Sequence, residues 1–402
     1  MPPTSYPATQ PAETPALSQA LIWLMAVSCA VAVANVYYNQ PLLHEFSRYF
    51  HTTVRSAGLV ATAAQVGYGV GLLFFIPLGD VVERKKVILC LSYACTLLLA
   101  LGALSTSLPI LIAAQFLIGL TAVNPQLLIP LAVEMSHPQH RGRAVGSLMA
   151  GLLSGLLLAR TASGYLGDKF GWRAVFWIAC ALMFLSTVAL QKMLPSRPPT
   201  LSISYPKLMQ SLWRLACDQP RLRAPSLIGA LSFAAFCAFW AVLSFFMEQR
   251  HHLGATQTGL FGLVGLAGAM CAPMAGRLSD RKGSGLTITL ALGLSIVAFA
   301  WMGISGSIPG LIIGVLLLDL GVQSIQVAAQ SEVMALLPEA RNRLNTIYMV
   351  SRFGGGAIGT TIGTWVYASH GWTGTTLTGI GLLALAGLIH MALRTAKGSR
   401  PA

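Results

Sequence analysis

The stretches "PLGDVVERKKVIL" (residues 77–89) and "GRLSDRKGSG" (residues 276–285) are two similar segments in different halves of this chain. Each has a leucine two residues before an aspartate, and basic residues follow the aspartate within a few positions. The aspartates, Asp80 and Asp280, are separated by 200 residues. When a loop that contains both acidic and basic residues recurs further along the chain, a structural unit has been duplicated.

Further pairs share the offset of 200 residues: Pro138 and Pro338, Arg141 and Arg341, Arg143 and Arg343, and the dipeptides Gly171–Trp172 and Gly371–Trp372. Independent pairs that agree on one offset predict two copies of one helical unit, as in transporters built from parallel repeats.

The composition predicts that both units span a membrane. Of 402 residues, 55% are hydrophobic and only 9% are charged, whereas a soluble protein has roughly a quarter charged. The apolar residues come in blocks of about 20, the length that crosses the hydrocarbon core as a helix. We expect twelve spans, at residues 19–41, 57–78, 87–105, 108–133, 144–165, 174–194, 227–247, 259–278, 286–304, 308–337, 344–367 and 375–393. The predicted fold class is an all-α integral membrane protein with two pseudo-symmetric six-helix bundles.

The predicted domains follow from these spans. Residues 1–18 are rich in Pro, Thr and Ala, lack the positive flank of a secretory signal, and are expected to form a disordered cytoplasmic tail. Residues 19–194 form the first bundle, 195–226 a cytoplasmic linker, 227–393 the second bundle and 394–402 a basic cytoplasmic tail.

The distribution of charge predicts the orientation. The net charge is +14, and nineteen Lys and Arg residues fall on the side of the linker against five on the other side. This asymmetry is typical of the positive-inside rule, so we expect both termini in the cytoplasm of a bacterium and the spans in its inner membrane. The positive charge thereby has an explanation that needs no nucleic-acid partner.

The two opening stretches resemble the signature loop of the major facilitator superfamily, Gly-x-Leu-x-Asp-Arg-x-Gly-Arg-Arg. The second copy keeps five of its positions: Gly276, Leu278, Asp280, Arg281 and Gly283. The first copy keeps Leu78, Asp80, Arg84 and Lys85, but has Ile76, Val81 and Glu83 where the family has Gly, Arg and Gly. The phrases "YYNQPLL", "HRGRAVGSLMAGLLSG", "GWRAVFWI" and "ARNRLNTIYMVSRFGGGAIG" resemble the drug:proton antiporter and sugar-efflux branch.

The resemblance implies two bundles around a central cavity that opens alternately to either side. In the family, the aspartate of the loop docks at a helix N-terminus, where the helix dipole is positive, and latches the halves in the outward-facing state. The chain departs from the branch at two places. Ala159 and Arg160 stand where the antiporter helix has Gly-Pro, and Gln115 stands where the fourth span has an arginine.

Three ionisable residues lie inside predicted spans, where a charge is costly and usually marks function: Arg160, Asp319 and Arg352. Asp319 lies roughly 16 Å from one face of the membrane and Arg352 roughly 12 Å from the other, at 1.5 Å per helical residue. Because these depths are similar, we expect the two to pair. Two interpretations of Asp319 stay open: a carboxylate that exchanges a proton as the cavity alternates, or a permanently paired structural ion.

Polar and aromatic residues within the spans are the candidates for the wall of the substrate cavity. On the first helix, Asn35, Tyr38 and Asn39 share one face, and we expect this face to border an outward-opening cavity, with Tyr37 as an anchor at the membrane interface. The full set of candidates is Asn35, Tyr38, Asn39, Gln40, Gln65, Tyr68, Gln126, Arg160, Phe233, Phe236, Trp240, Gln323 and Asn345.

The predicted function is secondary active transport of a small organic solute by alternating access. Proton-coupled efflux of a drug-like compound, sugar or metabolite is favoured, and uptake of a small organic anion by symport is the alternative. A membrane-embedded enzyme is the third possibility, but the histidines lie mainly in loops and form no metal or nucleophile pattern. We therefore expect no cofactor and no metal, a monomer, and the solute, protons and bilayer lipid as partners.

Overall fold

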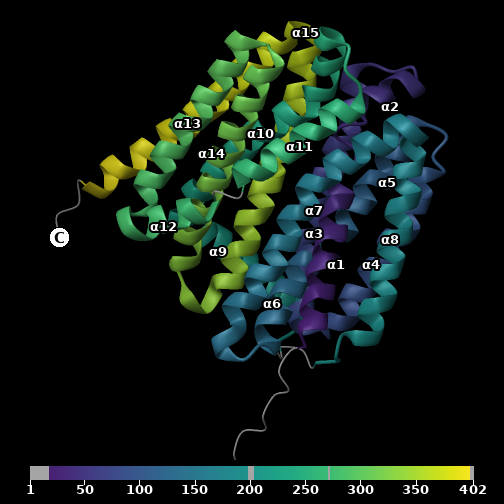
Figure 1. The fold of residues 1–402 in the computed structure, drawn as a ribbon. Helices are drawn as coiled ribbons and strands as arrows, with labels where there is room; N and C mark the ends of the chain where they lie inside the picture. The colour runs from purple at the N-terminus through teal and green to yellow at the C-terminus, as the bar shows by residue number, and fades with distance from the viewer. Residues whose placement is uncertain (1–17, 198–202, 270–271, 399–402) are drawn as a thin grey trace, which may run out of the picture.

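The structure is a computed structural model that describes residues 18–197, 203–269 and 272–398. Within these ranges, the side chains of residues 138, 269, 272–275, 280, 338 and 393–398 are outside the description. The secondary structure of the described residues is helical, without a strand. Figure 1 shows the purple-to-teal helices of the first half beside the green-to-yellow helices of the second half.

The first half contains α1 (Gln19–Tyr37), α2 (Leu43–Tyr49), α3 (Val54–Val81), α4 (Arg84–Ala103), α5 (Leu108–Thr121), α6 (Pro125–Met135), the short 3₁₀ helix η1 (Pro138–His140), α7 (Arg141–Phe170) and α8 (Trp172–Met193). The second half contains α10 (Pro220–His251), α11 (Ala255–Ala269), α12 (Ala272–Lys282), α13 (Ser284–Ser305), α14 (Ile308–Ala335), η2 (Pro338–Ala340) and α15 (Arg341–Gly398). Helix α9 (Tyr205–Asp218) lies between the halves in the sequence.

The helices match the predicted spans. Among the described residues, ten segments are long and apolar enough to cross a membrane. One of them, Arg341–Ala392, has 52 residues, enough for two crossings, and its backbone leaves the helical conformation at Gly371. Helices α11 and α12 account for the remaining predicted span. The all-α membrane fold predicted from the sequence is thereby confirmed.

The backbone repeats at the predicted offset. Gly171 has φ of 78° and Gly371 has φ of 60°, values that side chains with a Cβ rarely adopt, so glycine is required at both turns. Each glycine is followed by a tryptophan. The 3₁₀ turns η1 and η2 also lie 200 residues apart. The sequence offset therefore reflects two copies of the same local geometry.

The two halves meet along two pairs of helices, α3 with α15 and α7 with α11. The α7–α11 crossing is very close. A Cβ added to Gly164 would lie 2.2 Å from the carbonyl oxygen of Ala255, and one added to Gly259 would lie 2.5 Å from that of Arg160. Small residues let helix backbones approach in this way in membranes. This crossing brings Arg160 to the boundary between the halves.

The predicted linker contains a helix that the sequence analysis missed. Helix α9 buries Leu208 and Leu212, while Trp213 is 74% exposed. It contacts both halves: the Tyr205 hydroxyl donates to the carbonyl of Phe74, and Arg343 donates to the Ser211 hydroxyl. Helix α10 also begins earlier than predicted, at Pro220 instead of residue 227, because Pro220 suits the first turn of a helix.

We call the end of the bundle that carries α9, η1 and η2 the linker side, and the end that carries α2 the α2 side. In Figure 1, α2 lies at the top, and α6 and α9 lie toward the bottom.

Candidate functional site

A cavity of about 160 Å³ lies between the two halves. Its wall comes from helices α1, α3, α6, α7, α10, α14 and α15. The polar groups are two tyrosines, four glutamines and one arginine: Tyr37, Tyr68, Gln126, Gln323, Gln326, Gln330 and Arg352. The rings of Phe233, Phe236 and Phe353 and several Leu, Val and Met side chains complete the wall, and none of the described lining residues is acidic. The cavity therefore carries one positive charge within an aromatic and amide surface.

Arg352 supplies the charge of the cavity. Its side chain is 4% exposed, and the guanidinium carbon lies 4.1 Å from the centre of the Phe233 ring, a cation–π distance. Tyr348, one helical turn earlier, lies beside it. The Nη1 group has no hydrogen-bond partner among the described residues. A buried guanidinium with a free N–H group is suited to bind an anionic group.

The predicted pair between Asp319 and Arg352 is wrong. Asp319 is fully buried on α14, and its carboxylate lies against Gly265 of α11, where an added Cβ would be 3.1 Å from Oδ2. Both carboxylate oxygens lack a hydrogen-bond partner in the described part of the chain. The cation that acts electrostatically on Asp319 is Arg160 from the other half. Asp319 and Arg352 were expected to pair because their depths in the membrane are similar, but their helices do not turn the two side chains toward each other.

Arg160 is held by an amide and three aromatic rings. It is fully buried, and its Nε donates to Gln40 Oε1 at 2.8 Å. Its guanidinium carbon lies 3.9 Å from the ring centre of Trp240, with the rings of Tyr37 and Phe236 at 5.1 Å and 5.7 Å. The terminal Nη1 and Nη2 groups have no partner among the residues described. The aromatic faces stabilise the cation without neutralising it.

The polar side chains at the end of α1 point in a different direction from the one predicted. Asn35 points into the first bundle, where its amide contacts Cys95 Sγ at 3.6 Å, and Asn39 donates to Gln115 Oε1 at 3.0 Å. Tyr38 lies on the same side, near Cys95. Tyr37 is not an interface anchor, because it is 1% exposed and lines the cavity.

The other predicted cavity residues divide into two groups. Tyr68, Gln126, Phe233, Phe236 and Gln323 line the cavity. The second group lies outside the cavity wall. Gln40 and Trp240 surround the Arg160 guanidinium. Gln65 is buried beside Tyr37, and Asn345 accepts a hydrogen bond from Gln330 at 2.7 Å.

Sequence reasoning missed several lining residues, among them Gln326, Gln330 and Phe353. The signal was present in α14, because Gln323, Gln326 and Gln330 are spaced so that they share one helical face.

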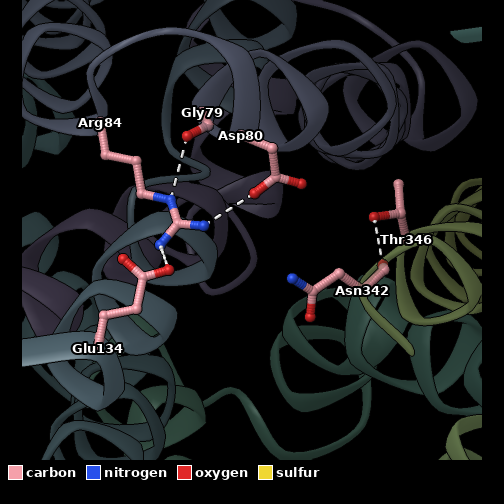
Figure 2. A network of polar contacts seen from close by, with 6 residues as sticks. All are labelled: Gly79, Asp80, Arg84, Glu134, Asn342 and Thr346. Atoms are coloured by element: carbon pink, nitrogen blue, oxygen red, sulfur yellow. Dashed lines mark hydrogen bonds and ion pairs between the residues drawn. The ribbon is translucent and has the colours of Figure 1, made fainter. Parts of the chain in front are cut away.

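Figure 2 shows the first signature loop on the linker side. Arg84 donates to three acceptors at once: the Gly79 carbonyl at 3.1 Å, Asp80 Oδ1 at 2.8 Å and Glu134 Oε1 at 2.6 Å. Asn342 and Thr346 of α15 stand across from this cluster in Figure 2. No hydrogen bond joins Asp80 to α15 within the described residues, so the expected docking at a helix N-terminus is not made in this conformation.

The remaining loop residues are described only in part. Lys85 is half-buried, and Arg281 is exposed. Gly276 faces Val327 with room for a Cβ, and Gly283 has φ of 87°. The side chain of Asp280 lies outside the described residues.

The halves are joined at the α2 side. Asp168 at the end of α7 accepts hydrogen bonds from the backbone N–H groups of Ala255 and Thr256 at 3.3 Å and 2.8 Å, which caps the first turn of α11. The His44 ring packs edge-on against Phe245 of the other half. These contacts hold the two halves together at the α2 side of the boundary.

A second, polar cavity of about 720 Å³ lies at this end, with Glu45, Asp168, Glu248 and Ser244 in its wall. Burial raises the pKa of the Glu45 carboxyl, an effect opposed by the hydrogen bond from the Trp172 N–H. The described residues contain no group of three or more His, Cys, Asp or Glu placed to hold a metal ion.

Comparison with known proteins agrees with this architecture. The sequence profile of the Major Facilitator Superfamily matches residues 23–360. The chain is 40% identical over 367 residues to the "Uncharacterized transporter YgaY" of Escherichia coli O157:H7, covering 90% of this chain and 93% of the relative. It is 32% identical over 418 residues to "Probable transporter SCO4007" of Streptomyces coelicolor, covering 100% and 93%. The "Chloramphenicol resistance protein" of Streptomyces lividans is 27% identical over 65% of this chain and 67% of its own.

Two solved structures share the fold at low sequence identity. The bacterial homologue of the human lysosomal transporter Spinster, in an inward-facing and unoccupied conformation, has a TM-score of 0.73 at 14% identity, covering 94% of this chain and 98% of its own. The human organic anion transporter MFSD10 has a TM-score of 0.69 at 19% identity, covering 93% and 100%. The family and these relatives are transporters, not enzymes. The chain belongs to the Major Facilitator Superfamily of secondary transporters.

Proposed function

We propose that this transporter exports a small amphipathic organic solute with an anionic group, in exchange for protons. The observation that carries the proposal is Arg352, a buried guanidinium on the wall of the central cavity with a free N–H group and no carboxylate among the described lining residues. A buried cation in that position favours a ligand that supplies the missing negative charge.

The rest of the cavity wall supports the amphipathic part of the solute. Phe233, Phe236 and Phe353 offer ring faces and edges, and the amides of Gln126, Gln323 and Gln326 offer donors and acceptors. Apolar walls with a few polar groups are typical of sites for small organic molecules. The volume of about 160 Å³ is below the roughly 300 Å³ of drug-sized pockets, so a larger solute requires the halves to move apart.

Asp319 is the candidate for proton coupling. Burying a carboxylate without a partner costs free energy, which a proton or an approaching cation can remove. The absence of a hydrogen-bond partner among the described residues favours the proton-exchanging interpretation over a permanently paired ion. Arg160, across the boundary between the halves, is the cation that could neutralise Asp319 in another conformation.

Two observations support export. The positive-inside rule favours a cytoplasmic linker side, and the cavity wall includes Met149 and Gln330 toward that side, while Asp168 joins the halves at the α2 side. This arrangement suits loading from the cytoplasm, with both termini there and the spans in the inner membrane. The likeness to a chloramphenicol resistance protein also favours export. Proton-driven uptake of an organic anion is the second candidate, because Arg352 would bind the same solute in either direction.

Ligand-induced thermal stabilisation tests the binding half of the proposal, since a ligand that binds the folded state stabilises it by an amount that grows with the ratio of its concentration to its Kd. The probes are three molecules of similar shape: benzenesulfonate (anion), benzenesulfonamide (neutral) and phenyltrimethylammonium (cation). Benzenesulfonate is expected to raise the melting temperature of the purified protein most. Arg352→Gln is expected to abolish this preference, and Arg250→Gln, which removes an exposed arginine outside the cavity, to keep it. Equal stabilisation by all three probes would contradict the proposal that the solute carries an anionic group.

A further inference from the structure

A groove of about 560 Å³ runs along the outer surface of the second half, between α10 and α15, and reaches α9 through Ala216. Its wall is mostly apolar, with Leu227, Ala230, Ile347, Ile358 and Leu382. It shares no lining residue with the central cavity. Leu227 is 46% and Ile358 is 60% exposed, so the groove opens toward the lipid that surrounds the bundle. Its occupant therefore comes from the bilayer.

The length of the groove corresponds to one leaflet. Along α10 it extends from Leu222 to Ala234, a separation of twelve residues or about 18 Å at the rise of an α-helix. Half of the hydrocarbon core of a bilayer is about 15 Å thick. A groove of this length beginning at the linker side accommodates one acyl chain from the interface to the middle of the membrane.

Of the three polar side chains in the groove wall, Arg223 and Ser226 lie at its interfacial end, and the third, Ser351, donates its hydroxyl to the Ile347 carbonyl. Arg223 is exposed in the first turn of α10, and one of its N–H groups donates to the Cys217 carbonyl. Ser226, one turn further, is 6% exposed, and its hydroxyl has no hydrogen-bond partner among the described residues. None of the residues that line the groove is acidic. A basic side chain at headgroup depth attracts anionic lipid.

Two adjacent glycines of α15 determine the depth of the groove. A Cβ at Gly355 would lie 2.2 Å from the carbonyl oxygen of Ala230, so the two helices touch there. A Cβ at Gly354 would meet nothing within 4 Å. The helices are thus in contact at the floor, while the position beside it is left hollow, and a larger side chain at Gly354 would fill the groove without displacing its neighbours.

We propose that this groove binds an anionic phospholipid of the leaflet on the linker side, with the phosphate at Arg223 and one acyl chain along α10 and α15. The site lies apart from the solute pathway and does not depend on the proposed solute.

Native mass spectrometry of the full-length protein tests the proposal. The protein is delipidated and titrated with dioleoyl phosphatidylglycerol or dioleoyl phosphatidylcholine, and bound lipid is counted. The wild type is expected to retain one phosphatidylglycerol at concentrations where phosphatidylcholine is lost. Arg223→Gln is expected to weaken phosphatidylglycerol retention about tenfold, since a hydrogen bond to a charged group contributes about 1.5 kcal/mol or more. Gly354→Leu is expected to weaken retention of both lipids.

Arg221→Gln is the matched control, because Arg221 is an exposed arginine two residues away that does not line the groove. It is expected to retain phosphatidylglycerol like the wild type. Equal retention of the two lipids by the wild type, unchanged retention in both Arg223→Gln and Gly354→Leu, or equal losses in Arg221→Gln and Arg223→Gln would each overturn the proposal. Arg223→Gln changes an exposed side chain, so the test stands even if Gly354→Leu fails to fold.

Discussion

Arg160 and Asp319 are two fully buried, opposite charges that act on each other from different halves of the transporter, yet no hydrogen bond joins them among the described residues. The glycines of α11 separate them: Gly262 lies against Arg160 and Gly265 against the Asp319 carboxylate. Because the halves move relative to each other during alternating access, the separation of this pair depends on the conformation. We therefore propose that the charge state of Asp319 depends on how the two halves are arranged.

Asp319→Asn is expected to uncouple transport from protons. The variant cannot exchange a proton at this position, so accumulation of benzenesulfonate driven by a pH gradient should be lost, while exchange of labelled for unlabelled benzenesulfonate without a gradient should remain. Both rates are measured in proteoliposomes. Glu332→Gln, on the same helix α14, is the control and should keep both activities. Proton-driven accumulation that survives in Asp319→Asn would show that the proton is carried elsewhere.

The electrostatic relationship also predicts a coupling in stability. Arg160→Gln removes the cation that acts electrostatically on Asp319, and a buried carboxylate without a compensating charge costs free energy. The double variant Arg160→Gln/Asp319→Asn removes both charges and should recover part of this loss. A double-mutant cycle on thermal unfolding measures the interaction, expected at about 1 kcal/mol or more. Additive effects of the two changes would mean that the residues do not interact.

Asp168 is expected to hold the α2 side closed. Its carboxylate caps α11 across the boundary between the halves, and replacing a helix N-cap by alanine costs about 1 kcal/mol, roughly a fivefold change in a population. In a Ser244→Cys background, Asp168→Ala should speed labelling by a membrane-impermeant maleimide about fivefold, because Ser244 is buried in the wall of the cavity that Asp168 also lines. Asp168→Asn retains an acceptor and should show a smaller effect. Equal labelling rates in all three proteins would show that this contact does not control access to the cavity.

The partly buried carboxyl of Glu45 is expected to make the stability of the protein depend on pH. Because burial raises the pKa of its carboxyl in the folded protein, the folded state binds the proton more tightly than the unfolded chain does. The contribution to stability is thus fully present below the unfolded value of about 4.3 and is lost as the pH rises through the higher folded pKa. Glu45→Gln should flatten this decline in the melting temperature above about pH 4.3. An unchanged pH profile in Glu45→Gln would refute the assignment.

The features that depend on position along the chain could be predicted from the sequence. Hydropathy predicted the spans, because crossing the hydrocarbon core requires a fixed length. The offset of 200 residues predicted a repeat that reappears in the backbone of Gly171 and Gly371. Helix α9 also has a signal in the sequence, because Leu208 and Leu212 are spaced so that they share one helical face.

The features that depend on rotation about a helix axis could not be predicted. Periodicity correctly grouped Asn35, Tyr38 and Asn39 on one face of α1, but it does not reveal which neighbour that face meets, and the face turned toward α4 and α5 instead of the cavity. The same limit explains the wrong partner for Asp319. Depth followed from the residue count, whereas the choice of Arg160 over Arg352 depends on how the two halves pack.

The central claim is that a solute with an anionic group passes through the cavity at Arg352. Counterflow of radiolabelled benzenesulfonate in proteoliposomes tests it most directly, because this probe is permanently charged and counterflow requires no assumption about the coupling ion. The wild type should show saturable counterflow that benzenesulfonamide does not inhibit, and Arg352→Gln should lower the rate at low concentration by about ten- to a hundredfold, as expected for losing a buried charge-assisted hydrogen bond. Counterflow no faster than in empty liposomes, or equal rates in the wild type and Arg352→Gln, would contradict it.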